Sequence, residues 1–225
     1  MKFGGIQRTS TIDFPGVLAC VVFCAGCDMN CFYCHNRSLI PFVGKMPAED
    51  VCAFLEKRAG RLDGVVVSGG EPTLQPDLLE FLQFCRDLGY KIKLDTNGQR
   101  PKTVERILEN ALADYVAVDL KALRPAYLEV CGTPPEQVKA EDTIRLLLKT
   151  GAAFEVRTTL YPGMALQELQ ALLRSQPPVP RWRLGDFQMP ADADISDGRF
   201  QRPLLTKRGL APQWDALCKL QPGLV

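Results

Sequence analysis

The sequence has no long hydrophobic run and almost no excess charge of either sign. No apolar stretch reaches the ~20 residues that a membrane-spanning helix needs, and residues 1–5 lack the apolar centre of a signal peptide. The 27 Lys and Arg residues against 26 Asp and Glu give a net charge of +1, which offers no electrostatic footprint for nucleic acid or an anionic membrane. We therefore expect a cytoplasmic protein with no nucleic-acid partner and no membrane partner.

Histidine is also scarce, because His35 is the only one among 225 residues. A Ser–His or Cys–His catalytic pair is therefore not expected elsewhere in the chain. As a neighbour of Cys34, His35 is interpreted either as a group that tunes or shields a bound centre or as a simple exposed loop residue. The length of the chain suits one large domain with a real core.

Cysteine, in contrast, is abundant and clustered. Five of the nine cysteines lie between residues 20 and 34, and this odd number favours reduced thiols and metal ligation over a disulfide framework. The spacing of Cys27, Cys31 and Cys34 lets one short loop wrap three sulfurs around a single iron–sulfur cluster. Three protein ligands would leave one iron open for a small molecule, as a catalytic zinc site leaves one position open.

Two other ligand sets remain possible. Cys20, Cys24 and Cys27 have the same spacing, but Cys20 and Cys24 lie in or at the end of a predicted strand, where a cluster would replace core packing. We favour the later triplet, with Cys20 and Cys24 as small buried residues. A zinc site made by Cys24, Cys27, Cys31 and Cys34 is the rival interpretation. The other cysteines are isolated from one another and predict no second cluster: Cys52, Cys85, Cys131 and Cys218.

Apolar runs alternate with amphipathic segments along the chain. The apolar runs predict strands at 17–23, 65–67, 91–94, 115–120, 154–160 and 182–187. The amphipathic segments predict helices at 47–59, 78–88, 101–108, 137–149, 166–173 and 213–220. Six strand–helix repeats are typical of a parallel sheet with right-handed crossovers. Because six units are two short of a full barrel, we expect an α/β fold with a partial, laterally open (β/α)6 TIM-like barrel.

The two ends of the chain differ in composition from its centre. Residues 1–18 are rich in Gly, Thr and Ser and contain the turn signal Pro15-Gly16, so we expect a short N-terminal arm or hairpin before the main fold. Residues 19–189 would form the barrel. Residues 190–225 would be a tail of the same domain, which either covers the open side of the barrel or contacts a partner.

Polar and charged groups recur where the predicted strands end. The carboxyl ends of parallel strands converge at one edge, so functional groups of such a barrel gather there. The segments at these ends are the cysteine loop, Ser68-Gly69-Gly70-Glu71-Pro72, Asp95-Thr96-Asn97-Gly98, Asp119-Leu120-Lys121, Arg157-Thr158-Thr159 and Phe187-Gln188-Met189. We expect the functional site at this edge.

Each of these segments also has an ordinary structural interpretation. Asp95, ahead of Asn97-Gly98, is by itself typical of a turn. Lys121 and Arg157 are suited to strand-end ion pairs with Asp119 or Glu155. Glu71 after two glycines fits a turn at the start of a helix.

Taken together, the motifs resemble a known superfamily. Cys27-x-x-x-Cys31-x-x-Cys34 with Tyr33 before the last cysteine, followed by Gly69-Gly70-Glu71-Pro72, resembles the radical S-adenosylmethionine (SAM) superfamily. Further segments resemble the glycyl radical enzyme activases, and among these the activating proteins of anaerobic ribonucleoside-triphosphate reductase: Thr11-Ile12-Asp13-Phe14-Pro15-Gly16, Cys34-His35-Asn36, Asp95-Thr96-Asn97-Gly98 and Asp119-Leu120-Lys121. The resemblance extends from residue 4 to residue 163.

The resemblance implies a particular set of cofactors. Cys27, Cys31 and Cys34 would hold a 4Fe-4S cluster whose open iron is chelated by the amino and carboxylate groups of SAM. The residues implied in SAM binding are Tyr33, Gly69, Gly70, Glu71, Asp95, Lys121 and Arg157, with Glu71 on the ammonium group and Lys121 and Arg157 on the carboxylate. A monovalent cation is implied between Asp95, Thr96 and Asp119. No catalytic residue beyond these cofactor ligands is expected.

The resemblance also implies an activity. The enzyme would cleave SAM reductively under anaerobic conditions and install a glycyl radical on a large partner, anaerobic ribonucleotide reductase, with electrons from a donor such as flavodoxin or ferredoxin. The alternatives are a radical SAM enzyme that acts on a small molecule, such as a deazapurine-forming synthase, and a non-catalytic zinc-binding protein. One departure stands out, because Phe187-Gln188-Met189-Pro190 has no histidine where pyruvate formate-lyase activases have one.

Overall fold

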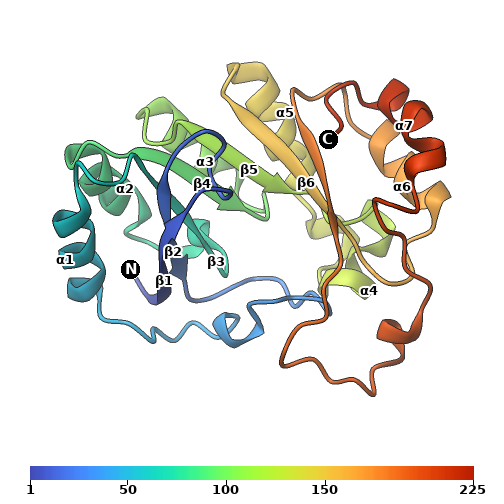
Figure 1. Cartoon of the computed structure of the whole chain (residues 1–225), viewed down its shortest axis with the longest axis horizontal. Coiled ribbons are helices and arrows are strands. Elements are labelled where there is room, and N and C mark those ends of the chain that lie inside the picture. Colours follow the sequence, from blue (N-terminus) through green and yellow to red (C-terminus); the bar gives the residue numbers. More distant parts are fainter.

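The computed structural model describes all 225 residues and contains one sheet of seven strands (Figure 1). The strands are β1 (Phe3–Ser10), β2 (Ala19–Cys24), β3 (Gly64–Gly69), β4 (Lys91–Thr96), β5 (Tyr115–Asp119), β6 (Phe154–Leu160) and β7 (Trp182–Asp186). They lie in sequence order across the sheet. Strands β2 to β7 are parallel, and β1 runs antiparallel to β2.

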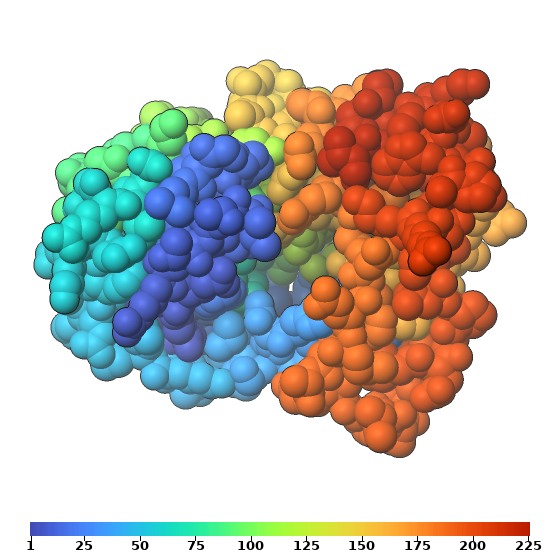
Figure 2. Space-filling view, viewed as in Figure 1, coloured from blue at the N-terminus to red at the C-terminus, as the bar shows by residue number.

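The sheet does not close on itself, because β1 and β7 are its two edges. Figure 2 shows the surface hollowed between the blue N-terminal part of the chain and the orange and red C-terminal part. The six parallel strands and the open side confirm the predicted partial (β/α)6 barrel.

Seven α-helices connect or follow the strands. They are α1 (Ala48–Arg58), α2 (Leu78–Asp87), α3 (Pro101–Glu109), α4 (Tyr127–Cys131), α5 (Ala140–Thr150), α6 (Leu166–Arg174) and α7 (Trp214–Leu220). Short 3-10 helices lie at Arg37–Leu39, Pro72–Leu74, Arg124–Ala126, Pro135–Gln137, Gly198–Gln201 and Ala211–Gln213. None of the helices combines the length and the apolar character needed to span a membrane.

The structure differs from the sequence prediction in three elements. Residues 3–10, expected as an arm or hairpin ahead of the main fold, form a seventh strand, because β1 pairs with β2 from Phe3 to Ser10. Helix α5 begins at Ala140, not at Gln137, since Val138 is extended (φ −67°, ψ 124°) and separates α5 from the preceding 3-10 helix. The short helix α4 was not predicted, because five residues are too few for a periodic pattern.

Alternate residues of each parallel strand face the helices or the barrel interior. In β3, Val65 and Val67 belong to the large apolar cluster beneath the helices, whereas Val66 packs inside the barrel with Phe14 and Val21. The same alternation directs every second residue of β4, β5 and β6 inward. Polar residues at these inward positions therefore reach the mouth of the barrel at the carboxyl ends of the strands.

The C-terminal tail covers the free edge of β7. Trp182 N donates to Gly223 O at 2.8 Å, Val225 N donates to Trp182 O at 2.8 Å, and Leu184 N donates to Val225 O at 3.3 Å. The tail therefore protects one edge of the sheet from pairing with other chains. Its buried anchor is Gln221, whose side-chain Nε2 donates to the carbonyls of Leu173 and Gln176 at 2.9 and 3.0 Å.

We predict that Gln221→Ala destabilises the protein by about 2–4 kcal/mol, because several buried backbone groups lose their partner at once. Besides its Nε2 bonds, the Oε1 atom of Gln221 accepts from Val179 N at 3.2 Å. Urea unfolding followed by circular dichroism measures the effect. Gln201→Ala, an exposed tail residue whose side chain makes no hydrogen bond, is the matched control and should stay within about 0.5 kcal/mol of the unmodified chain. Equal stability of the two variants would contradict the anchoring role.

Candidate functional site

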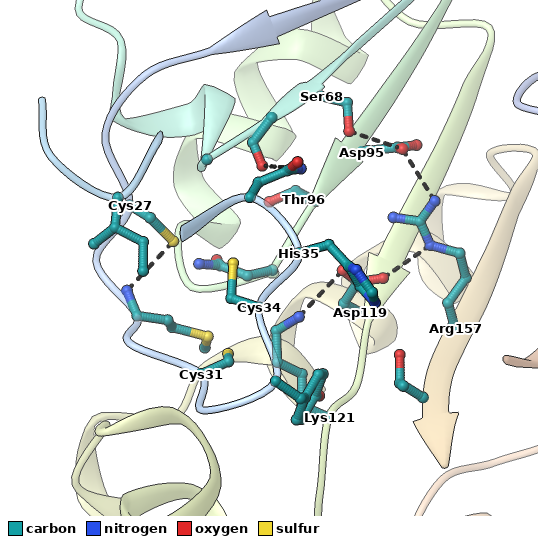
Figure 3. A pocket seen from close by; sticks show the side chains of 18 residues that line it. Cys27, Cys31, Cys34, His35, Ser68, Asp95, Thr96, Asp119, Lys121 and Arg157 are labelled. Carbon is teal, nitrogen blue, oxygen red and sulfur yellow. Dashed lines mark hydrogen bonds and ion pairs between the residues drawn. The ribbon is translucent and has the colours of Figure 1, made fainter. Parts of the chain in front are cut away.

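The carboxyl ends of the parallel strands surround a cavity of about 190 Å³ (Figure 3). Nearly all the residues expected to bind cofactors line it, although they come from five separate segments of the chain. These are Cys27, Cys31, Tyr33, Cys34, Gly69, Gly70, Asp95, Thr96, Asp119, Lys121 and Arg157. Glu71 is the exception. The structure thus brings the predicted site together at the predicted edge of the sheet.

The cysteine loop is held over this cavity by backbone hydrogen bonds on both sides. On one side, Gly26 N donates to Leu39 O at 2.7 Å and Cys27 N donates to Ile40 O at 3.0 Å. On the other, Asn30 N donates to Cys131 O at 2.8 Å, at the end of α4. These hydrogen bonds fix both sides of the loop, and its three sulfurs face one space (Figure 3).

The glycine pair after β3 lets two backbone segments come unusually close. A Cβ on Gly69, whose φ is +111°, would lie 2.4 Å from Cys24 N, and a Cβ on Gly70 would lie 2.2 Å from Gly26 O. Glu71 N donates to Gly26 O at 2.7 Å, which continues the β2–β3 pairing beyond the strands. The glycines are needed because no side chain fits between the cysteine loop and the turn.

Glu71 supports the cavity from below and does not line it. Its side chain is fully buried, and its Oε1 accepts from Thr73 N at 3.1 Å and from Thr96 Oγ1 at 2.7 Å. Its Oε2 accepts from Asn97 N at 2.7 Å. Burial raises the pKa of Glu71 although these hydrogen bonds favour the carboxylate. In this structure Glu71 thus orders the Thr96-Asn97 turn, and its contact with a ligand ammonium group stays a prediction.

Four charged side chains form a connected row along the opposite side of the cavity. Arg157 donates from Nε to Asp119 Oδ1 at 2.8 Å and from Nη1 to Asp95 Oδ2 at 3.0 Å. Lys121 Nζ lies 3.2 Å from Asp119 Oδ2. The sheet register causes this arrangement, because Asp119 and Arg157 are opposite each other on β5 and β6. The remaining guanidinium nitrogen of Arg157, Nη2, makes no hydrogen bond within the protein and points into the cavity (Figure 3).

Burial and these ion pairs shift several pKa values. Burial alone would raise the pKa of Asp119, but Arg157 and Lys121 together hold it well below its usual range. Burial raises the pKa of Cys27 to about 12. A hydrogen bond from Cys131 and the ammonium of Lys121 outweigh burial and lower the pKa of Cys31 to about 7.

Aromatic side chains pack behind the cysteine loop. Tyr33 stacks on Tyr161 with ring centroids 5.6 Å apart and an interplanar angle of 8°. Its hydroxyl is buried but makes no hydrogen bond. Phe32 packs against Phe200 of the tail at 5.5 Å, and the guanidinium of Arg199 lies 4.7 Å from the Phe32 ring. The tail therefore contacts the back of the cysteine loop as well as the edge of β7.

Cys20, Cys24 and His35 lie apart from the group of three thiols. Cys20 and Cys24 are fully buried in β2, in agreement with their interpretation as core residues. No set of three or more Cys, His, Asp or Glu side chains converges on a point where a single metal ion would fit. His35 is exposed at the rim of the cavity.

Some residues of the site were not singled out from the sequence. Ser68 lines the cavity, and its hydroxyl donates to Asp95 Oδ2 at 3.1 Å. Lys93 lies below the cavity, 3.3 Å from Asp95 Oδ1. Ser68 is two residues after the inward-facing Val66, and Lys93 is two residues before the inward-facing Asp95. Side chains on a strand alternate between its two faces, so this spacing could have identified both residues. Phe187 stacks on Phe200 and, like Met189, does not line the cavity.

Comparison with known proteins identifies the family. Residues 21–175 match the radical SAM superfamily. MJ1227 of Methanocaldococcus jannaschii, whose assigned name is glycyl-radical enzyme activating enzyme, is 36% identical over 170 residues, which cover 73% of this chain and 70% of that protein. The chain is a radical SAM enzyme of the glycyl-radical enzyme activating family. The pyruvate formate-lyase-activating enzyme of Streptococcus mutans is 30% identical over 70% of this chain and 64% of its own length.

Solved structures of other radical SAM enzymes share the fold of this one. Streptococcus suis SuiB bound to S-adenosylmethionine superposes with a TM-score of 0.61 at 20% identity, covering 77% of this chain and 41% of SuiB. TYW1 with a lysine–pyruvate adduct gives a TM-score of 0.65 at 18% identity, covering 90% of this chain and 74% of TYW1. The chain spans less than half of the SuiB chain, and at these identities the likeness concerns the fold alone.

We predict that Gly70→Ala destabilises the protein by about 1–3 kcal/mol, because its Cβ overlaps the Gly26 carbonyl and one backbone segment has to move. The cysteine loop should then take up less iron on anaerobic reconstitution. Gly5→Ala is the matched control, since a Cβ on Gly5 has no atom within 4 Å. Thermal unfolding together with iron analysis checks both effects, and full stability with full iron content in Gly70→Ala would contradict the close-approach argument.

We predict that Glu71→Gln, although nearly isosteric, costs about 1–3 kcal/mol of stability. An amide NH2 in place of one oxygen faces the backbone N–H of Asn97, and two donors cannot pair. Guanidinium unfolding gives the free energy directly. Glu105→Gln on an exposed face of α3 should leave it unchanged, so a similar effect of both substitutions would show that Glu71 has no special supporting role.

Proposed function

We propose that this enzyme cleaves SAM reductively and removes a hydrogen atom from a backbone glycine of a partner enzyme, which leaves a glycyl radical there. The observation that carries the proposal is the single cavity where three thiols face a row of carboxylate, guanidinium and ammonium groups. The relationship to glycyl-radical enzyme activating enzymes supports the partner class.

The residues of the cavity fit a 4Fe-4S cluster and SAM. Cys27, Cys31 and Cys34 offer three sulfurs at separate points around one space, which suits three corners of a cluster. The unpartnered hydroxyl of Tyr33 is a buried hydrogen-bonding group that a bound cofactor can satisfy. The chemistry that this pair of cofactors supplies when bound is one-electron cleavage of the sulfonium to methionine and a 5'-deoxyadenosyl radical.

The protein's part in this chemistry is to bind, orient and shield. The free Nη2 of Arg157 and the ammonium of Lys121 would receive the SAM carboxylate. Asp95 holds the guanidinium of Arg157 in place, with Oδ2 3.0 Å from Nη1. Gly69 and Gly70 let the cysteine loop approach the turn after β3 closely, and the buried aromatic side chains behind Tyr33 would exclude water from the site.

We infer that the partner is an anaerobic ribonucleoside-triphosphate reductase, on the basis of the motif resemblance in residues 4–163. The open side of the barrel supports a protein substrate, because a glycine-bearing loop has to reach the cavity. A low-potential donor such as flavodoxin or ferredoxin would supply the electron. The cysteine-rich loop with an odd total of nine cysteines supports a reducing compartment, the cytoplasm.

The monovalent cation that the resemblance implied is not part of this proposal. Asp95 and Asp119 already pair with Arg157, and Thr96 Oγ1 donates to Glu71. The oxygens expected to bind a cation are thus engaged by the protein itself, and the set does not fit that ion.

We predict that the anaerobically reconstituted, reduced protein forms 5'-deoxyadenosine from SAM, and that adding the partner reductase yields an organic radical signal in electron paramagnetic resonance. Cys31→Ala should abolish both signals, because one corner of the cluster loses its ligand. Cys52→Ala, a cysteine of α1 far from the cavity, should retain both. A fully iron-loaded protein that forms no 5'-deoxyadenosine would refute the proposal.

A further inference from the structure

A buried ammonium group lies directly beneath the proposed SAM site. Lys93 is on β4, two residues before Asp95, and its side chain is only 1% exposed. Its Nζ lies 3.3 Å from Asp95 Oδ1 and 3.5 Å from Glu155 Oε1. It also donates a hydrogen bond to the backbone carbonyl of Asp13. Lys93 itself does not line the cavity.

The surroundings of Lys93 leave the ammonium no route to solvent. Tyr115 is opposite Lys93 on β5, and its ring centroid is 5.8 Å from Nζ. Phe14 packs against Tyr115 with ring centroids 6.2 Å apart and closes the bottom of the barrel. A buried charge is tolerated only where it is paired and hydrogen-bonded, so the ammonium is bound to the two carboxylates.

Lys93 belongs to a continuous row of ion pairs through the barrel. The charges of successive side chains in the row alternate in sign. Its members are Arg181, Glu155, Lys93, Asp95, Arg157, Asp119 and Lys121. Four of these side chains are cations and three are anions, so the row carries one surplus positive charge. Arg181 is 43% exposed, and the six other side chains balance, so each carboxylate of the row already has a cation beside it within the protein.

The oxygen atoms of the expected cation set are nearly all occupied. Asp95 Oδ2 accepts from Arg157 and Ser68, and both oxygens of Asp119 face Arg157 or Lys121. Within this set, Asp95 Oδ1 is the buried oxygen that has no hydrogen bond. Lys93 is the cation that this oxygen faces.

We propose that Lys93 takes the place of a monovalent cation in this enzyme. It is a positioning residue: it holds Asp95 and supplies the positive charge beside that carboxylate, so that Arg157 and Lys121 bind the carboxylate of SAM without Na⁺ or K⁺. The inference rests on the proposed SAM site and specifies how that site is charged.

The test is calorimetric titration of SAM into the reconstituted protein, kept anaerobic and without reductant so that SAM stays intact. The buffer contains tetramethylammonium chloride, NaCl or KCl at one ionic strength, which keeps general screening constant. The dissociation constant should agree within about twofold in the three salts, because no inorganic cation completes the site. A requirement of the unmodified protein for Na⁺ or K⁺ would overturn the inference.

Two substitutions of Lys93 sharpen the test. In tetramethylammonium chloride, Lys93→Ala should weaken SAM binding about tenfold, as expected for loss of one charge-assisted contact. Added K⁺ or Na⁺ should restore its affinity, because the shortened side chain leaves room for an ion. Lys93→Met removes the charge but fills the space. Its SAM binding should therefore be weakened, and added K⁺ or Na⁺ should not restore it. A purely structural role of Lys93 predicts no rescue by salt.

The control is Lys91→Ala, the same change two residues earlier on β4, where the side chain is exposed. It should bind SAM like the unmodified chain in all three salts. Iron content and visible absorption are recorded for every variant so that loss of the cluster is not mistaken for loss of SAM affinity. If Lys93→Ala does not fold, the comparison of the three salts on the unmodified protein still tests whether SAM binding requires Na⁺ or K⁺. Absence of SAM binding in every salt would instead refute the proposed function.

Discussion

The site depends on the close approach of two backbone segments, Cys24–Gly26 and Gly69–Glu71. Hydrogen bonds from Gly70 N to Cys24 O at 2.8 Å and from Glu71 N to Gly26 O at 2.7 Å extend the pairing of β2 and β3 past their ends. Only glycine fits at positions 69 and 70. This contact fixes where the cysteine loop begins, and it places the three thiols over the same cavity as the ends of β4, β5 and β6. Without it the loop would have no defined position relative to the charged row.

The sequence was sufficient for the parts of the structure that follow local patterns. Apolar runs located the parallel strands to within about two residues, and the missing repeats of a full barrel predicted the open side. The convergence of strand ends brought Asp95, Asp119 and Arg157 into one site, as expected for a parallel sheet. Their roles as ligands of SAM remain predictions, whereas their common location is a direct consequence of topology and register.

Features that depend on contacts between distant segments were not predictable in the same way. Glu71 was expected to face a ligand, but Thr73, Thr96 and Asn97 donate to it from below the cavity. The tail offered no periodic signal for its pairing with β7 or its packing on Phe32. Lys93 stood out neither by motif nor by spacing from the cysteines, and only the geometry of three strands shows that it pairs with two carboxylates. Asn97 lies far from Glu71 in the sequence, Glu155 far from Lys93 and Phe32 far from the tail, so local pattern carries no information about these contacts.

The charged interior and the open side serve one purpose in this account, which is to hold SAM firmly while a glycine of another protein reaches it. The most direct measurement of that claim uses partner reductase produced with glycine deuterated at the α carbon. After incubation with the reduced enzyme and unlabelled SAM, mass spectrometry should detect 5'-deoxyadenosine that has gained one deuterium, because the hydrogen atom comes from the partner's glycine. Unlabelled 5'-deoxyadenosine at the same yield, with no radical on the partner, would contradict the account.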